Sequence, residues 1–284
     1  MSNSNPVGLP YIDHVLEDLS DSDADLELRK LFSRHIHWGY WENPSIAACT
    51  LESLAMAHEQ LSQQVADAGQ IQSGQRVLDC GCGFGGTIAN LNDRLHDMDL
   101  VGLNIERRQL EIARSSFHPQ HGNHVEFIEG DACNLPFDDN SFDRVLAVEC
   151  IFHFPSRQRF FQEVKRVLRP GGILSLCDFV PREITLSLDK VFKRIIQSRI
   201  SANYGAVDYS YGIQKYRALA NETGLLPLVE RDITANTLPT YPVTARVLKQ
   251  NDRTYHDRDS AVLPDRLSRL GLIRYMILAY KQIQ

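Results

Sequence analysis

The sequence predicts an α/β fold built on a doubly wound, mostly parallel, seven-stranded sheet. From residue 75 to about 180, short apolar segments typical of buried strands alternate with segments of helical periodicity. A glycine cluster at positions 81, 83, 85 and 86 separates the first of these strands from the first helix. Such glycines let the backbone turn sharply and approach a ligand at the end of a parallel strand.

The elements follow in order along the chain. Helices are expected over 87–95, 106–117 and 156–172, the last ended by Pro170, Gly171 and Gly172. A further helix with a glycine stop, followed by a strand, is expected within 216–234. The other strands are expected over 75–81, 99–105, 124–132, 142–150, 172–180 and 274–282. Right-handed crossovers would place the carboxyl ends of the parallel strands along one edge of the sheet, where ligands bind.

The flanking regions do not continue this alternation. We expect residues 1–74 to form an N-terminal helical arm, interrupted by an aromatic cluster at 35–41, ahead of a core over 75–180. Residues 181–250 are expected to form a cap insertion with late core elements, and 251–284 a helix and the terminal strand. The arm and the insertion would cover the ligand edge of the sheet.

Composition excludes several classes of function. The net charge is −6, which disfavours nucleic acid as a partner because phosphate binding wants a basic face. The six cysteines form no CxxC pair, so neither a metal site nor a disulfide framework is expected, and reduced thiols fit a cytoplasmic location. The N-terminus lacks a signal pattern, and no apolar run reaches the about 18 residues that span a bilayer. We expect a cytoplasmic monomer or homodimer that acts on a small molecule.

The glycine turn is compatible with two classes of cofactor. A dinucleotide would place its pyrophosphate at the start of the following helix. S-adenosylmethionine (SAM) carries no phosphate but has an ammonium and a sulfonium. Asp79, at the end of the first strand, would attract these cations and repel a pyrophosphate. The sequence therefore favours SAM.

The stretch VLDCGCGFGG at 77–86 resembles motif I of the class I SAM-dependent methyltransferases, whose fold is Rossmann-like. Further blocks agree in order and spacing: LVGLNI resembles the second strand of that family, EGDACNLPFDDNSFD its adenine-binding turn, and EVKRVLRPGGILSLCDF its passage into strand five. The segment HWGYW at 37–41 matches an aromatic segment of the small-molecule members, of the tocopherol, sterol, sugar-O and ubiquinone/menaquinone type.

The resemblance implies a cofactor site at the strand ends. Asp79 would face the amino group of SAM, and Asn104 would bind the ribose where the family usually has an acid, with Glu106 as the fallback carboxylate. Asp131 would accept a hydrogen bond from the adenine amino group, and Ala132 would donate its backbone N–H. The remaining implied cofactor residues are Tyr40, Trp41, Gly81, Cys82, Gly83, Gly85, Ile105, Gln109 and Glu149.

The resemblance also implies a base. His153 and Asp178 follow adjacent strands and match a proposed base pair of the sugar-O members, although His153 has the alternative of packing among aromatic rings and Asp178 of capping a turn. His35, His37, Cys80 and Cys82 are expected to be structural. Tyr204, Tyr209 and Tyr211 would either pack the insertion or line an apolar substrate pocket.

The resulting prediction is transfer of a methyl group from SAM to an oxygen or nitrogen of a small-molecule acceptor of specialised metabolism, without a divalent metal. The alternatives are C-methylation of a quinone, tocopherol-like or prenyl substrate, and SAM binding without catalysis.

Overall fold

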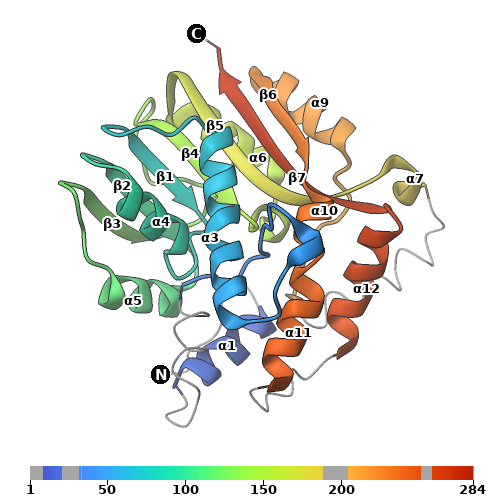
Figure 1. The fold of residues 1–284 in the computed structure, drawn as a ribbon. Coiled ribbons are helices and arrows are strands. Elements are labelled where there is room, and N and C mark those ends of the chain that lie inside the picture. The colour runs from blue at the N-terminus through green and yellow to red at the C-terminus, as the bar shows by residue number, and fades with distance from the viewer. Residues whose placement is uncertain (1–8, 21–31, 33, 188–203, 251–257, 284) are drawn as a thin grey trace. The chain divides into compact units, whose positions relative to one another are not determined.

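The computed structural model describes residues 9–20, 32, 34–187, 204–250 and 258–283 (Figure 1). Parts of the expected N-terminal arm, the helical pattern over 188–203 with its basic stretch, and residues 251–257 lie outside the described residues. The chain forms two compact units. The first unit comprises Met1–Leu61, Phe179–Ile213 and Ile233–Tyr275, and the second comprises Ser62–Asp178, Gln214–Asp232 and Met276–Gln284. The four-part division expected from the sequence stays a prediction.

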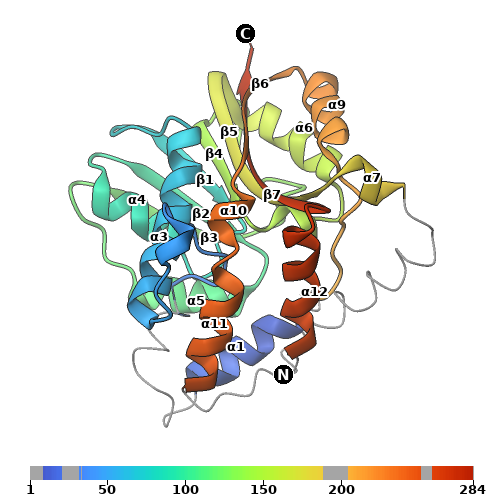
Figure 2. The same cartoon turned by 45° about the vertical axis from the view of Figure 1, so that its right-hand side comes forward.

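Seven strands form one sheet in the order β3-β2-β1-β4-β5-β7-β6, which confirms the doubly wound fold. Strands β1 to β5 pair in parallel, whereas β6 runs antiparallel to β7. Figure 2 shows the strands between α4 (Gly86–Arg94) on one side and α6 (Arg157–Val167) on the other. The apolar residues of the central strands are buried, because the helices that alternate with these strands along the chain cover both faces of the sheet. The strands are β1 Arg76–Cys80, β2 Asp99–Asn104, β3 His124–Glu129, β4 Phe142–Val148, β5 Leu168–Pro181, β6 Leu225–Asp232 and β7 Ile273–Gln282.

Helices connect the strands, and Figure 1 shows α4 and α6 on opposite faces of the sheet. Each crossover helix buries one apolar stripe, and α6 is a clear case, with Phe160, Phe161 and Val164 buried. The helices that lie wholly or partly in the second unit are α3 Leu51–Ala68, α4 Gly86–Arg94, α5 Arg107–Ser116, η2 Ile151–His153, α6 Arg157–Val167 and α9 Ile213–Thr223. The others are α1 Pro10–Ser20, η1 Pro44–Ile46, α7 Glu183–Leu186, α10 Thr234–Thr237, α11 Thr240–Gln250 and α12 Arg258–Arg269.

Several predicted boundaries were wrong; the strand expected over 124–132, for example, ends at Glu129. The helix expected over 156–172 ends at Val167, because the chain joins β5 at Leu168, which pairs with Phe142. The residues Pro170 and Gly171 then lie within an irregular stretch of β5, where the register shifts between Phe142 and Arg144. The strand expected over 142–150 ends at Val148, because the next residue leaves the extended conformation.

Three histidines pack together in the first unit. The ring centroids of His35 and His37 are 4.7 Å apart, and that of His58 lies 5.6 Å from His37 and 6.0 Å from His35. The Nε2 atom of His35 lies 2.9 Å from Glu59 Oε1, which also accepts a hydrogen bond from Arg34. Burial lowers the pKa of all three imidazoles, that of His37 to about 3. This cluster is consistent with the structural role expected for His35 and His37.

Acid should destabilise the fold through this cluster. Because the three folded-state pKa values lie below the ordinary value of 6.5, only the unfolded chain takes up their protons as the pH falls below that value. The stability that they contribute is therefore complete above pH 6.5 and is lost progressively on acidification. Urea unfolding of His58→Leu should show a smaller fall between pH 7 and pH 4.5 than the wild type. The exposed His118 provides the control His118→Leu, which should keep the wild-type profile. Parallel profiles for His58→Leu and the wild type would contradict this prediction.

Candidate functional site

The end of β1 presents a buried carboxylate. Asp79 is 1% exposed, and its Oδ1 atom accepts no hydrogen bond from any part of the chain that the structure describes. Burial raises the pKa of this carboxyl to about 7. Because a buried polar atom without a partner is costly, the site suits a ligand that brings a positive charge or a donor to Asp79.

The turn after β1 needs its glycines for different reasons. Gly81, Gly83 and Gly85 all have positive φ values, of 74°, 54° and 83°. A Cβ atom on Gly81 would lie 2.7 Å from Cys150 Cβ, and one on Gly85 would lie 2.9 Å from the Phe127 ring. At Gly83, by contrast, the nearest atom would be Gln109 Nε2, at 3.7 Å. Packing within the protein thus accounts for Gly81 and Gly85, whereas Gly83 faces space that a ligand can occupy.

The end of β2 carries an amide pair. Asn104 Nδ2 donates to Gln109 Oε1 at 2.8 Å, and the backbone N–H of Ile105 donates to Asn104 Oδ1 at 3.0 Å. Both amide side chains are buried, and Gln109 Nε2 has no hydrogen-bond partner among the described residues. Glu106 is committed elsewhere: it caps α5 by accepting from the backbone N–H of Arg108 and pairs with its guanidinium. This arrangement favours Asn104 and Gln109 over Glu106 as the groups that bind ribose hydroxyls.

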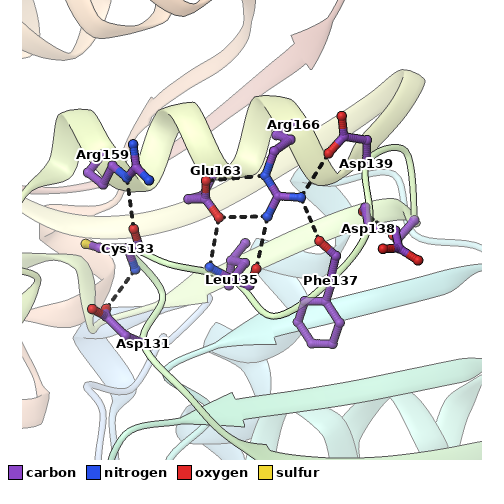
Figure 3. A network of polar contacts seen from close by, with 10 residues as sticks. Asp131, Cys133, Leu135, Phe137, Asp138, Asp139, Arg159, Glu163 and Arg166 are labelled. Atoms are coloured by element: carbon purple, nitrogen blue, oxygen red, sulfur yellow. Dashed lines mark hydrogen bonds and ion pairs between the residues drawn. The ribbon is translucent and has the colours of Figure 1, made fainter.

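The loop after β3 is tied to α6, as Figure 3 shows. Asp131 is exposed, and its Oδ1 atom accepts from the backbone N–H of Cys133 at 2.8 Å, while Ala132 is buried. From α6, Glu163 accepts from the backbone N–H of Leu135 at 2.8 Å. Arg166 donates to the backbone carbonyls of Leu135 and Phe137 and pairs with Asp139. These bonds fix the segment that would receive the adenine.

The turn after β4 has an unusual backbone. Glu149 has φ 53°, a left-handed conformation that is uncommon for a residue other than glycine and often marks a functional site. Cys150 follows, and its Sγ atom donates to the backbone carbonyl of Cys80 at 3.0 Å. His153 ends η2, half-buried, with its ring centroid 4.5 Å from that of Phe152. The His153 turn, defined as residues 149–156, therefore lies directly against the glycine turn.

Near the end of β5, two side chains bind the carboxylate of Asp178. Asp178 is fully buried, and its Oδ2 atom lies 2.9 Å from Arg157 Nη2 and accepts a hydrogen bond from the Tyr216 hydroxyl. The sequence did not reveal Arg157 or Tyr216, because an arginine at the start of an amphipathic helix is usually solvated. A base pair of His153 with Asp178 stays a proposal.

The aromatic segment at 35–41 belongs to the first unit. Trp41 is buried in a cluster with Leu54 and Val243, and its indole N–H donates to Ser53 Oγ at 3.2 Å. Tyr40 is half-buried and donates its backbone N–H to Ala57 at 2.8 Å. Contacts of Tyr40 and Trp41 with the cofactor therefore stay proposals. In the insertion, the Tyr204 ring packs 5.8 Å from that of Tyr11, and Tyr209 and Tyr211 are half-buried.

The cysteines near the site are thiols. All six cysteines of the chain are free, and burial raises the pKa of Cys80, Cys82 and Cys150 well above its ordinary value. Within the described ranges, no group of three or more His, Cys, Asp or Glu side chains has the geometry of a metal site. Across the same ranges, none of the helices combines the length and the hydropathy that spanning a bilayer requires.

Comparison with known proteins agrees with this geometry. A family model described as a methyltransferase domain matches residues 78–176. The chain is 35% identical over 243 residues to methyltransferase GfsG of Streptomyces halstedii, covering 85% of this chain and 83% of the relative. It is 32% identical over 228 residues to 27-O-demethylrifamycin SV methyltransferase of Amycolatopsis mediterranei (strain S699), covering 79% and 78%.

Among solved structures, geranyl diphosphate C-methyltransferase from Streptomyces coelicolor A3(2), crystallised with Mg²⁺, geranyl diphosphate and S-adenosyl-L-homocysteine, superimposes with a TM-score of 0.73. The alignment covers 99% of this chain and 100% of that one at 16% identity, so it shows a shared fold. Asp79 Oδ1 and Gln109 Nε2 have no hydrogen-bond partner among the described residues, and Gly83 faces open space. These features fit SAM, whose cations suit the carboxylate and whose hydroxyls suit the amide.

Adding a methyl group at Gly83 should block the cofactor. Gly83→Ala and Gly74→Ala both place a side chain at a positive φ, of 54° and 81° respectively, and a Cβ added at Gly74 would meet no atom within 4 Å. Only Gly83→Ala fills space at the site, where overpacking by about 1–3 kcal/mol corresponds to roughly 5- to 150-fold weaker binding. Calorimetric titration with SAM measures this. Equal affinities for the two variants would show that Gly83 serves the backbone alone.

Cofactor affinity should depend on the protonation of Asp79. With its pKa raised to about 7 by burial, the carboxyl must lose its proton before it can face a cation, so affinity should rise with pH up to about 7 and then level off. Calorimetry in two buffers with different ionisation enthalpies would detect the released proton. Asp79→Asn should bind more weakly and release none. If the affinity of the wild type for SAM does not change between pH 5.5 and pH 8.5, this role of Asp79 is excluded.

Proposed function

The chain belongs to the class I SAM-dependent methyltransferases of the small-molecule type, and on this premise we propose that it methylates a hydroxyl oxygen of a natural-product acceptor. The name of the rifamycin relative specifies methylation at an oxygen, which supports this choice over nitrogen. The expected cytoplasmic location, the monomeric or homodimeric state and the absence of nucleic acid from the reaction remain predictions.

One observation carries the proposal: the glycine turn and the His153 turn adjoin each other at the ends of neighbouring strands. β1 and β4 pair in parallel, with Asp79 opposite Leu146. A Cβ atom on Gly81 would lie 2.7 Å from the Cβ atom of Cys150, which is three residues before His153. A cation held by Asp79 and a hydroxyl held by His153 would therefore occupy the same end of the sheet.

The residues of the chain itself need to perform few chemical steps. SAM supplies a methyl group on a positively charged sulfur, which makes that carbon electrophilic. His153 accepts the proton of the acceptor hydroxyl, so that the oxygen attacks with increased electron density. The remaining work is to align the reacting atoms and exclude water, and such positioning contributes roughly 7–11 kcal/mol in well-oriented systems.

Two alternatives are tested by the same experiment. C-methylation of a quinone, tocopherol-like or prenyl substrate would need charge stabilisation rather than a base, for which Glu149 is the candidate. SAM binding without catalysis would need neither. The purified protein should be incubated with SAM labelled with ¹³C in the methyl group and a panel of hydroxylated natural products that includes 27-O-demethylrifamycin SV. The ¹³C chemical shift of the transferred methyl distinguishes oxygen from nitrogen and carbon. A methyl on carbon, or tight SAM binding without transfer to any panel member, would overturn the proposal.

Replacing His153 should separate catalysis from binding. His153→Ala removes the base, so kcat should fall by about 10²–10⁴-fold while SAM affinity measured by calorimetry stays unchanged. His118→Ala, on an exposed residue, is the matched control and should retain wild-type kcat. A near-normal kcat for His153→Ala with the identified acceptor would remove the base role from this residue.

A further inference from the structure

Three polar side chains meet in the interior of the second unit. Arg157 and Asp178 form an ion pair at 2.9 Å, and their side chains are only 1% and 0% exposed. The Tyr216 hydroxyl donates to the same carboxylate oxygen, Oδ2, and the Arg157 guanidinium lies 5.5 Å from the centroid of the Tyr216 ring. The three residues come from α6, β5 and α9, so the cluster joins three elements that are distant in sequence.

Stability alone does not explain such a cluster. Moving two charges out of water carries a large desolvation penalty, and apolar residues of similar volume often replace a buried ion pair without loss of stability. What a buried ion pair with fixed hydrogen bonds does provide is a defined geometry. Burial also raises the pKa of Tyr216, so its hydroxyl stays protonated as a donor to Asp178. Because Tyr216 is 0% exposed, it has no access to an acceptor molecule.

The geometry that this cluster defines is that of the His153 turn. At its start, Cys150 is held by its hydrogen bond to Cys80 and by the close approach of Gly81. At its end, Ser156 caps α6 by accepting from the backbone N–H of Arg159 at 3.1 Å, and Arg157 is the first residue of that helix. The turn is thus fixed to β1 at one end, and through Arg157 to β5 and α9 at the other.

We propose that Arg157, Asp178 and Tyr216 form a positioning unit that sets the orientation of the His153 turn against the glycine turn. Asp178 then acts through Arg157 and the backbone rather than as the partner of a base. This inference rests on the proposed function only in the role that it gives to His153. The position of the His153 ring can be observed without any acceptor, so the two proposals can fail separately.

The test replaces the ion pair by apolar residues. Arg157→Met combined with Asp178→Leu removes both charges together and leaves neither one buried alone. The matched control is Arg217→Met combined with Glu230→Leu, which removes an ion pair of 2.6 Å between α9 and β6 whose arginine is half exposed. Each protein is labelled with ¹⁵N-histidine, and the His153 ring signals, among those of ten histidines, are identified by their loss in His153→Gln.

The double variant at Arg157 and Asp178 should unfold at or above the wild-type temperature, yet its His153 ring shifts and their pH titration should change. The control should match the wild type in both. With an identified acceptor, kcat should fall by roughly 10²-fold at unchanged KM, because a displacement of about 1 Å has that effect. A folded double variant with wild-type His153 signals would overturn the proposal.

If the double variant does not fold, Tyr216→Phe tests the positioning unit in its place. It deletes one hydroxyl, leaves the ion pair in place, and should move the same His153 signals in the same direction by less. Signals that superimpose on those of the wild type would overturn the proposal. If the signals are displaced in the variant but the wild-type protein itself transfers no methyl group, the proposed function is contradicted and the positioning unit stands.

Discussion

The close approach of Gly81 to Cys150 is the contact on which the site depends. Parallel pairing of β1 with β4 brings their ends together, and only a residue without a side chain allows the two following turns to touch. The hydrogen bond from Cys150 to the carbonyl of Cys80 fixes that contact. The carboxylate that we propose for cofactor binding, Asp79, and the imidazole that we propose as the base, His153, thus belong to two adjoining turns.

The two buried carboxylates of the central strands, Asp79 and Asp178, differ in whether their oxygen atoms have hydrogen-bond partners within the protein. Asp79 is buried with an unsatisfied oxygen, an arrangement that is costly in the free protein and becomes favourable when a cation arrives. Asp178 is buried with its partners already in place, and that arrangement is complete without a ligand. The Asp79 carboxylate therefore suits ligand binding and the Asp178 carboxylate suits a structural role, although both residues lie in central strands of the same sheet.

The sequence predicted those parts of the protein that depend on local pattern. Apolar runs such as Val77–Cys80 identified the strands, and the glycine turn with Asp79 identified the cofactor class. The start of β5 was misplaced because Leu168 continues the helical pattern of α6, and only pairing with Phe142 makes it a strand. Arg157 and Tyr216 were missed because their partner Asp178 lies 21 and 38 residues away in the chain. Likewise, the reasons for Gly81 and Gly85 are contacts with Cys150 and Phe127, which no spacing rule reveals.

The raised pKa values of the thiols bear on how readily these groups react with an alkylating cofactor. SAM is an alkylating agent, and a thiolate is among the strongest nucleophiles that a protein carries. Cys82 lies within the glycine turn, and Cys150 is held against it. Burial keeps both as uncharged thiols, and Cys150 further directs its proton to a backbone carbonyl. The packing that shapes the turn thereby also keeps these two sulfur atoms in their less nucleophilic, protonated form.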